Sequence, residues 1–330
     1  MIPVPSSRDQ THLLRLPNWL GDLILSVPAV RLYQSWLNDR AQLAVAGPAS
    51  LAPLAPMLLP NLDYISVPTW PWAMGGELKK RNVVAATAFP NSLRVSLEIL
   101  SVPYRAGFER NLRNTLLTEN RPRRTSPYGF IHVADQYLGL LEDLGLPKGK
   151  KELPTPPPLS KPTEAPEKPF LAIFPGAAYG PAKRWDPSSF ASVIRDLVKE
   201  HSFEPILMGG PGDAESCHAV AEAYGSEICD LSGKTSTLAL AHWIAHARFV
   251  LCHDSGPMHL ASFLRRPGVA IFGSTEPAWT GPLGDTITVA RHKVSCSPCF
   301  LKVCPLDRRC MTRLTPEEVL TACRHRLSQK

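Results

Sequence analysis

The feature that most limits how this chain can fold is a proline-rich segment near its middle. Seven prolines stand among the sixteen residues from Pro154 to Pro169, and lysine, glutamate, serine and threonine fill most of the other positions. Such a composition cannot build a hydrophobic core and favours extended polyproline conformation, which is typical of a semi-rigid linker. The 330 residues amount to about twice a common single domain. We therefore predict two domains, residues 1–153 and 170–330, joined by a linker over residues 154–169.

Both halves open with the same succession of strand, loop and helix. The first half predicts a strand over residues 13–16, a loop over 17–22 and a helix over 23–37. The second half predicts strands over 170–174, 205–208, 249–252 and 269–272, and helices over 187–200, 214–224, 236–247 and from about 257. Alternating strands and helices predict an α/β fold with parallel sheets covered on both faces. Ligands are then expected in a cleft between the domains, at the carboxyl ends of the strands.

Composition narrows the class of protein. Hydrophobic residues make up 44% and charged residues 20%, which is typical of a folded chain rather than a disordered one. The first twenty residues hold no unbroken apolar run, and no stretch reaches 18 apolar residues, so we expect neither a secretory signal nor a membrane-spanning helix. We therefore predict a cytoplasmic protein, whose eight cysteines are free or bind metal.

The segment Asp254–His259 follows a predicted strand and opens a predicted helix. The free backbone N–H groups of a helix N-terminus bind anions, phosphate above all. Gly256 would allow close backbone approach, and the side chains of Ser255 and His259 would reach the same group. The alternative is that Asp254 or Ser255 only caps the helix.

The loop over residues 175–185 occupies the equivalent position after another strand. Its glycines and small residues permit a tight turn, and Lys183 supplies a compact positive charge for a diphosphate. Lys183 and Arg184 are otherwise typical of a solvated surface. The loop lacks the Gly-Lys-Ser/Thr ending of a P-loop, and neither half carries Gly-x-Gly-x-x-Gly after its first strand, which disfavours a nicotinamide enzyme.

Gly21 and Asp22 lie where the first predicted loop turns into the first predicted helix. A carboxylate at this point would take a proton from a sugar hydroxyl. It would equally serve as a helix cap that complements the helix dipole, and spacing alone favours the cap.

Five motifs, in order, resemble those of the bacterial lipopolysaccharide heptosyltransferases, which form glycosyltransferase family 9. They lie at residues 17–22, 90–92, 175–185, 231–235 and 254–259 and read Pro-Asn-Trp-Leu-Gly-Asp, Pro-Asn-Ser, Pro-Gly-Ala-Ala-Tyr-Gly-Pro-Ala-Lys-Arg-Trp, Leu-Ser-Gly-Lys-Thr and Asp-Ser-Gly-Pro-Met-His. Their order and spacing are most similar to the heptosyltransferase II group, over residues 13–290.

The resemblance implies a GT-B fold, in which two Rossmann-like domains face each other across a cleft. It implies that the donor ADP-L-glycero-D-manno-heptose binds the C-terminal domain and that an acceptor of the heptosyl-Kdo-lipid A type binds the N-terminal domain. The transfer it implies inverts the anomeric centre and needs no cofactor, with Asp22 as general base and Lys183 stabilising the departing ADP. The donor-binding residues it implies are Gly176, Ala177, Ala178, Lys183, Gly209, Gly210, Asp254, Ser255, Gly256 and His259. The acceptor-binding residues it implies are Asn18, Trp19, Gly21 and Asn91.

The net charge of +7 is concentrated in the first half. Seven arginines stand between Arg94 and Arg124 against three glutamates, which is either a solvated face or an anion-binding surface. A nucleic-acid site would interleave more aromatic residues for base stacking, so we expect no nucleic-acid partner. We predict that Arg121, Arg123 and Arg124 contact the acceptor or an anionic membrane, with the protein peripheral at the inner face of the inner membrane.

Four of the eight cysteines fall within fifteen residues, at Cys296, Cys299, Cys304 and Cys310. Four thiolates in a short loop would hold a structural zinc, or an iron–sulfur cluster, but the second Cys-x-x-Cys of a zinc ribbon is missing. Free thiols or disulfides are the alternative, and no catalytic role follows. The other cysteines are expected to be small buried hydrophobic residues; they are Cys217, Cys229, Cys252 and Cys323.

Two other functions stay open on the sequence alone. One is a related glycosyltransferase that uses another nucleotide sugar, another acceptor or another heptose position. The other is a non-catalytic protein that binds sugar nucleotides or nucleic acid through its basic surface.

Overall fold

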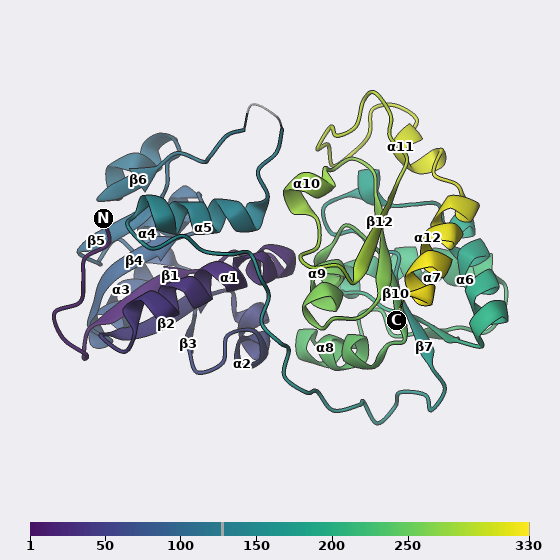
Figure 1. Ribbon diagram of the computed structural model, residues 1–330, viewed down its shortest axis with the longest axis horizontal. Coiled ribbons are helices and arrows are strands. Elements are labelled where there is room, and N and C mark those ends of the chain that lie inside the picture. Colours follow the sequence, from purple (N-terminus) through teal and green to yellow (C-terminus); the bar gives the residue numbers. More distant parts are fainter. Residues whose placement is uncertain (127–128, 330) are drawn as a thin grey trace. The chain divides into compact units, whose positions relative to one another are not determined.

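The computed structural model describes residues 1–126 and 129–329, and the chain divides into two compact units, Met1–Pro154 and Thr155–Lys330 (Figure 1). The strands of the first unit are β1 (Thr11–Arg15), β2 (Gln42–Gly47), β3 (Asp63–Ser66), β4 (Val83–Ala88), β5 (Tyr104–Phe108) and β6 (Glu119–Arg121). Its helices are α1 (Leu20–Leu37), α2 (Ala55–Leu58), α3 (Met74–Lys80), α4 (Leu93–Glu98) and α5 (Val133–Asp143), with 3-10 helices η1 (Ala49–Leu54), η2 (Pro71–Ala73) and η3 (Asn111–Leu116).

The second unit repeats this alternation of strands and helices. Its strands are β7 (Phe170–Phe174), β8 (Glu204–Leu207), β9 (Cys229–Asp230), β10 (Phe249–His253), β11 (Gly268–Phe272) and β12 (Ile287–Arg291). Its helices are α6 (Pro187–His201), α7 (Ala214–Tyr224), α8 (Thr237–His246), α9 (Gly256–Phe263), α10 (Pro277–Thr280), α11 (Arg309–Thr312) and α12 (Pro316–Ser328), with 3-10 helices η4 (Pro181–Lys183) and η5 (Pro211–Asp213).

The strand order is the same in both sheets. The first sheet runs β3-β2-β1-β4-β5-β6 and the second β12-β11-β10-β7-β8-β9, and the strands pair in parallel throughout the described ladders. Counted along each unit, both sheets have the 3-2-1-4-5-6 order of a Rossmann fold. The order reverses between β1 and β4 and between β7 and β10, and ligands of such sheets bind beside the carboxyl ends at this switch point. The predicted α/β fold with parallel sheets is confirmed.

Successive residues of a strand face opposite sides of its sheet, so each sheet needs helices on both faces. In β1, Leu13 packs in a buried cluster with Val95 of α4. His12, one residue earlier, faces the other side and contacts Tyr33 of α1 through its Nδ1, 2.9 Å from the hydroxyl. The first unit therefore has a core on each side of its sheet.

Two predicted boundaries of the first half are wrong by a few residues. The strand begins at Thr11 rather than residue 13, because Thr11 and His12 are buried in the ladder despite their polarity. The helix begins at Leu20 rather than residue 23, since the Leu23 amide already donates to the Trp19 carbonyl. Asp22 therefore lies inside α1 and not in the loop before it.

The proline-rich segment runs along the second unit. His242 of α8 contacts Ser160 through its Nδ1, 2.9 Å from the carbonyl oxygen, and Arg265 lies 3.4 Å from the Thr155 hydroxyl. The segment from Thr155 onward therefore forms part of the second unit. Among the helices within residues 1–126 and 129–329, none has the length and apolar character needed to cross a bilayer.

Candidate active site

Asp22 lies at the switch point of the first sheet, in the first turn of α1 directly after β1. The N-cap position of this helix belongs to Trp19, whose side chain is 66% exposed. A carboxylate in the first turn of a helix interacts favourably with the helix dipole. Asp22 is therefore not the N-cap residue itself, but it lies where a carboxylate complements the helix dipole, and this position also suits a base.

A buried ion pair holds the loop that leads to Asp22. Arg15, the last residue of β1, donates from Nε to Glu98 of α4 at 2.6 Å, and both side chains are almost completely buried. Arg15 also donates to the Leu16 carbonyl and, at 2.8 Å, to the Asn18 side-chain oxygen. A charged pair without water must keep its geometry, so it fixes the loop over residues 16–19.

The buried Tyr137 of α5 interacts electrostatically with both Asp22 and Arg123. Burial raises the pKa of Tyr137 well above its ordinary value, the charge of Asp22 raises it further, and Arg123 lowers it. The Arg123 guanidinium also lies 5.0 Å from the centre of the Phe108 ring. The first unit thus gathers the predicted base and one predicted cation around a buried tyrosine, a residue that no motif pointed to.

Asn91 lies after β4, on the other side of the same switch point. A second buried arginine, Arg113, holds this loop by donating to the Pro90 carbonyl and the Ser96 hydroxyl, each at 2.9 Å. Burial, followed by the charges of nearby arginines, lowers the pKa of Arg113 to about 10. Arg110 approaches the Asn91 side-chain oxygen at 3.4 Å.

Two of the three arginines predicted for the acceptor are held by carboxylates. Arg124 pairs with Glu142 at 3.0 Å and with Asp143 at 2.7 Å, both on α5. Arg121 pairs with Glu119 and donates from Nε to the Asp143 carbonyl at 3.1 Å. The basic surface expected from the sequence is therefore largely neutralised at these positions.

In the second unit, a buried network joins the loops at the switch point between β7 and β10. Lys183 Nζ contacts the Asp254 carboxylate at 2.5 Å and the Asp254 carbonyl at 3.2 Å. The Thr275 hydroxyl, after β11, donates to the same carboxylate at 2.6 Å. Lys183 is only 8% exposed and Asp254 5%. The structure thus brings the two predicted donor residues together, with much of the lysine charge balanced by Asp254.

His253, the last residue of β10, pins both ends of the loop over residues 176–185. Its Nε2 accepts from the Trp185 amide at 2.8 Å, so Nδ1 holds the proton and donates to the Gly176 carbonyl at 3.2 Å. Burial is the main cause that lowers the pKa of His253 to about 4. The imidazole is therefore neutral near pH 7. No motif assigned a role to His253. Its position between a strand and the predicted anion-binding segment is the signal that could have indicated one.

Asp213 joins the loops after β7 and β8. Its carboxylate accepts from the Gly210 amide at 3.0 Å. A Cβ placed on Gly176 would lie 2.0 Å from an Asp213 oxygen, and one on Gly209 would lie 2.7 Å from the Asp213 Cβ. Only glycine fits at these two positions, because the Asp213 side chain lies so close to the backbone. The role of Asp213 was not predicted from the sequence. Of the neighbouring loop residues, Ala177 is buried and Ala178 exposed.

The N-terminus of α9 completes this locus. Ser255 occupies the N-cap position, but its hydroxyl donates to the His253 carbonyl at 3.2 Å and accepts from no backbone amide of the helix. Gly256 opens the helix, and His259 lies one turn further and is buried. The backbone amides of this turn are suited to an anion.

The cysteine-rich loop packs on the loop that holds Lys183. The Ala182 amide donates to the Lys302 carbonyl at 3.0 Å, and the Tyr179 hydroxyl to the Phe300 carbonyl at 2.5 Å. All eight cysteines are free, and within the described residues no three histidine, cysteine, aspartate or glutamate side chains are placed to hold a metal ion. This geometry does not support the structural zinc. The expected burial is wrong for Cys229, which is exposed on the edge strand β9.

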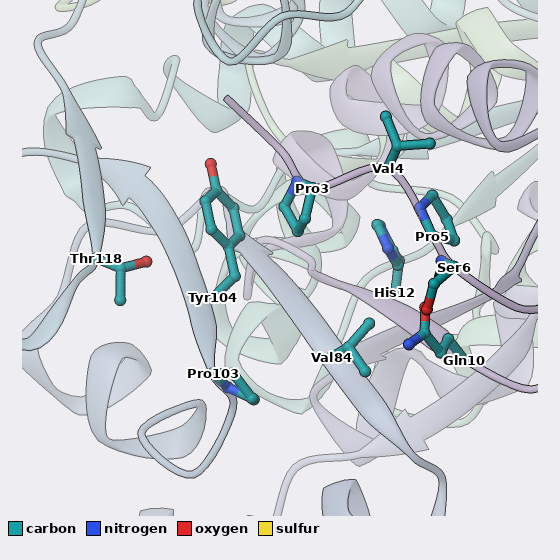
Figure 2. A pocket seen from close by; sticks show the side chains of 10 residues that line it. All are labelled: Pro3, Val4, Pro5, Ser6, Gln10, His12, Val84, Pro103, Tyr104 and Thr118. Atoms are coloured by element: carbon teal, nitrogen blue, oxygen red, sulfur yellow. Dashed lines mark hydrogen bonds between the residues drawn. The ribbon is translucent and has the colours of Figure 1, made fainter.

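A cavity of about 450 Å³ lies at the opposite, amino-terminal edge of the first sheet (Figure 2). Its walls come from the leader Pro3–Ser6 and from residues at the amino ends of β1, β4 and β5, among them His12, Val84 and Tyr104. Asp22 and Asn91 follow the carboxyl ends of these strands, so this cavity is separate from the candidate site.

Two Rossmann-order α/β units, each with polar loops at its switch point, have the architecture of the GT-B class. The model of glycosyltransferase family 9 (heptosyltransferase) matches residues 72–309, and the chain belongs to this family. It is 28% identical to lipopolysaccharide heptosyltransferase 2 of Salmonella typhimurium over 84% of this chain and 88% of that protein. It is also 28% identical to lipooligosaccharide heptosyltransferase 2 of Campylobacter jejuni, over 95% and 97% of the two chains. The solved Escherichia coli ADP-heptose lipopolysaccharide heptosyltransferase II matches with a TM-score of 0.78 at 25% identity, over 97% of this chain and 99% of that one.

Proposed function

We propose that this glycosyltransferase moves a heptose from ADP-L-glycero-D-manno-heptose to the inner core of lipopolysaccharide, as an enzyme of the heptosyltransferase II type. The first unit binds the acceptor, a heptosyl-Kdo-lipid A type glycolipid, and the second binds the donor. The observation that carries the proposal is the placement of Asp22 and of the Lys183–Asp254 network at the two switch points. Similarity to heptosyltransferases 2 over most of the chain supports the choice of sugar and acceptor.

In the proposed reaction, the acceptor hydroxyl attacks the anomeric carbon of the donor from the face opposite the diphosphate. Asp22 takes the hydroxyl proton as the new C–O bond forms, and the bond from the anomeric carbon to the diphosphate oxygen breaks, which releases ADP. Attack from the opposite face inverts the anomeric centre. The amides at the start of α9 and the Nζ of Lys183 stabilise the charge that develops on ADP.

The experiment that tests this proposal is transfer by the Asp22→Asn variant. An amide of the same shape cannot accept the proton, so we expect kcat to fall at least about 100-fold, while the Kd for ADP stays within about twofold. Transfer by the variant and by the wild-type enzyme is measured with the proposed donor and acceptor, and ADP binding is measured by calorimetry.

Asp135→Asn is the matched control for this variant. Asp135 lies in the first turn of α5, in the same unit and at the same place relative to a helix dipole, and pairs with Lys151 at the surface. Removing it should leave kcat within about twofold, because exposed pairs contribute little. Wild-type transfer by Asp22→Asn would remove Asp22 from the mechanism.

A panel of nucleotide sugars and truncated lipopolysaccharide acceptors tests the proposed substrates. We expect the highest kcat/KM for ADP-heptose with an acceptor that already holds one heptose, and unchanged rates in EDTA, because the reaction proposed here uses no metal. A higher kcat/KM for another nucleotide sugar would favour the related-glycosyltransferase alternative.

A further inference from the structure

Most of the exposed large hydrophobic side chains of the first unit follow the carboxyl ends of its strands, whereas Met1, Val4 and Leu100 lie elsewhere. Six large ones follow the carboxyl ends of strands and are at least 45% exposed: Trp19, Trp70, Trp72, Leu93, Leu112 and Phe130. Because these strands are parallel, their carboxyl ends share one edge, which is also the edge that holds Asp22. The opposite end of α4 shows one such residue, Leu100.

Four of these residues lie on segments that pack against one another and are here called the aromatic patch: Trp70, Trp72, Leu93 and Leu112. The two indoles stack with their ring centres 5.2 Å apart and remain 63% and 67% exposed. η2 holds Trp72 and packs against α4, which begins at Leu93, and α4 packs against η3, which holds Leu112. The patch therefore spans the loops after β3, β4 and β5.

Two arginines lie within this surface. Arg94 donates to the Pro68 carbonyl at 2.9 Å and to the Thr69 carbonyl at 2.7 Å, which ties the tryptophan loop to α4. Arg110 is exposed in the loop before Leu112. Tryptophan favours the interface between headgroups and acyl chains, and arginine binds lipid phosphates. Exposed apolar surface of this kind, rimmed by polar residues, is typical of a site that binds a protein or a membrane.

We propose that the aromatic patch docks the first unit on the headgroup region of an anionic bilayer. The inference rests on the proposed function in one respect, that the acceptor is a lipid anchored in such a bilayer. Trp70 and Trp72 enter the interface, Leu93 and Leu112 extend the apolar contact, and the exposed Arg110 binds lipid phosphate, whereas Arg94, paired with Glu98 at 3.2 Å, holds the tryptophan loop in place. Docking by this edge brings the loops around Asp22 to the membrane in which the acceptor lies.

The test is flotation of the purified full-length protein with vesicles that contain phosphatidylglycerol and phosphatidylethanolamine but no acceptor. The double variant Trp70→Ala, Trp72→Ala should bind the vesicles at least about tenfold more weakly, because it lacks the two indoles whose transfer from water into the bilayer interface favours binding. Leu93→Ala should weaken binding by a smaller factor. Leu100→Ala is the matched control, since Leu100 has nearly the same exposure, 46% against 48%, at the other end of α4.

Activity separates this inference from the proposed function. With an acceptor stripped of its acyl chains, the double variant should keep wild-type kcat and KM, whereas its KM for acceptor embedded in vesicles should rise several-fold. Equal flotation of wild type and double variant would overturn the docking inference, as would a wild-type dimer that the double variant abolishes, since the patch would then bind a second copy. Failure of the wild type to transfer heptose would overturn the proposed function while leaving the flotation result standing.

Discussion

The two units share one strand order but hold their functional loops by different chemistry. In the first unit, the buried guanidinium groups of Arg15 and Arg113 bind the loops on either side of the switch point. In the second, the neutral imidazole of His253 binds both ends of one loop. The neutral imidazole adds no charge beside the locus proposed for a diphosphate, whereas Arg15 brings a buried cation that is paired with Glu98. The same topology thus presents the candidate base in one unit and the candidate anion site in the other.

The largest effect that distinguishes the units concerns their buried ion pairs. Glu98→Gln leaves the Arg15 charge buried without a carboxylate, and we expect the free energy of unfolding to fall by about 3 kcal/mol. Urea unfolding followed by tryptophan fluorescence measures this loss. ADP affinity should not change, because Arg15 and Glu98 belong to the first unit.

Asp254→Asn is the counterpart in the second unit. It leaves Lys183 with the Asp254 carbonyl and an amide in place of a carboxylate, so stability and ADP affinity should both change. If Glu98→Gln alone altered ADP affinity, the division of roles between the two units would be wrong.

A second prediction concerns pH, since each unit contains a buried histidine whose pKa is lowered by burial. Burial lowers the pKa of both His12 and His253 from 6.5 to about 4. Above pH 6.5 the folded and unfolded chains both hold neutral imidazoles, so the stability is fully present. As the pH falls from 6.5 to 4, only the unfolded chain gains protons, and each histidine removes up to about 3 kcal/mol from the free energy of unfolding. Urea unfolding at several pH values measures this slope.

Two glutamine variants separate the histidines. His12→Gln and His253→Gln should each flatten the slope below pH 6.5, because each removes one group that titrates only when the chain unfolds. Only His253→Gln should also weaken ADP binding, by about tenfold, since it releases the loop over residues 176–185. A His253→Gln curve that overlays the wild type at every pH would contradict the role assigned to this imidazole.

The sequence could predict where the loops of the candidate site lie but not what holds them. A strand followed by glycine, aspartate or serine and then a helix is a local pattern, and the structure places Asp22, Lys183 and Asp254 after such strands, β1, β7 and β10. The supporting contacts join residues far apart in the chain: Arg15 with Glu98 across 83 residues and Trp185 with His253 across 68. Spacing along one element carries no information on such partners.

The same limit explains the arginines of the first unit. Their number predicts a basic surface, but Arg124 meets Glu142 and Asp143 only because α5 packs beside its segment. Net charge counts side chains and does not tell which of them are paired. The aromatic patch escaped the sequence analysis for a related reason, since its loops come together only in the folded sheet.

A third prediction compares two glycines of the second unit. Gly176→Ala places a methyl group 2.0 Å from an Asp213 oxygen, so the loops after β7 and β8 must separate, at a cost of about 1–3 kcal/mol. Gly212→Ala is the matched control, because nothing lies within 4 Å of the Cβ that it adds. Thermal unfolding of the two variants measures the difference, and ADP affinity should fall only for Gly176→Ala. Equal melting temperatures would mean that Asp213 does not need this close approach.

The smallest expected effect belongs to the cysteine-rich loop, an element that the first unit lacks. The double variant Cys299→Ser, Cys304→Ser should lower the free energy of unfolding by less than about 1 kcal/mol, because both side chains are partly exposed and, among the residues that the structure describes, neither belongs to a group placed to hold a metal. Cys310→Ser should cost more, since Cys310 is buried in the core of the second unit. Dialysis against EDTA should leave the melting temperature unchanged. One equivalent of tightly bound metal, lost together with several degrees of stability, would instead show that the four thiols converge in solution and that the loop over Lys183 is held by a metal as well as by the Lys302 and Phe300 carbonyls.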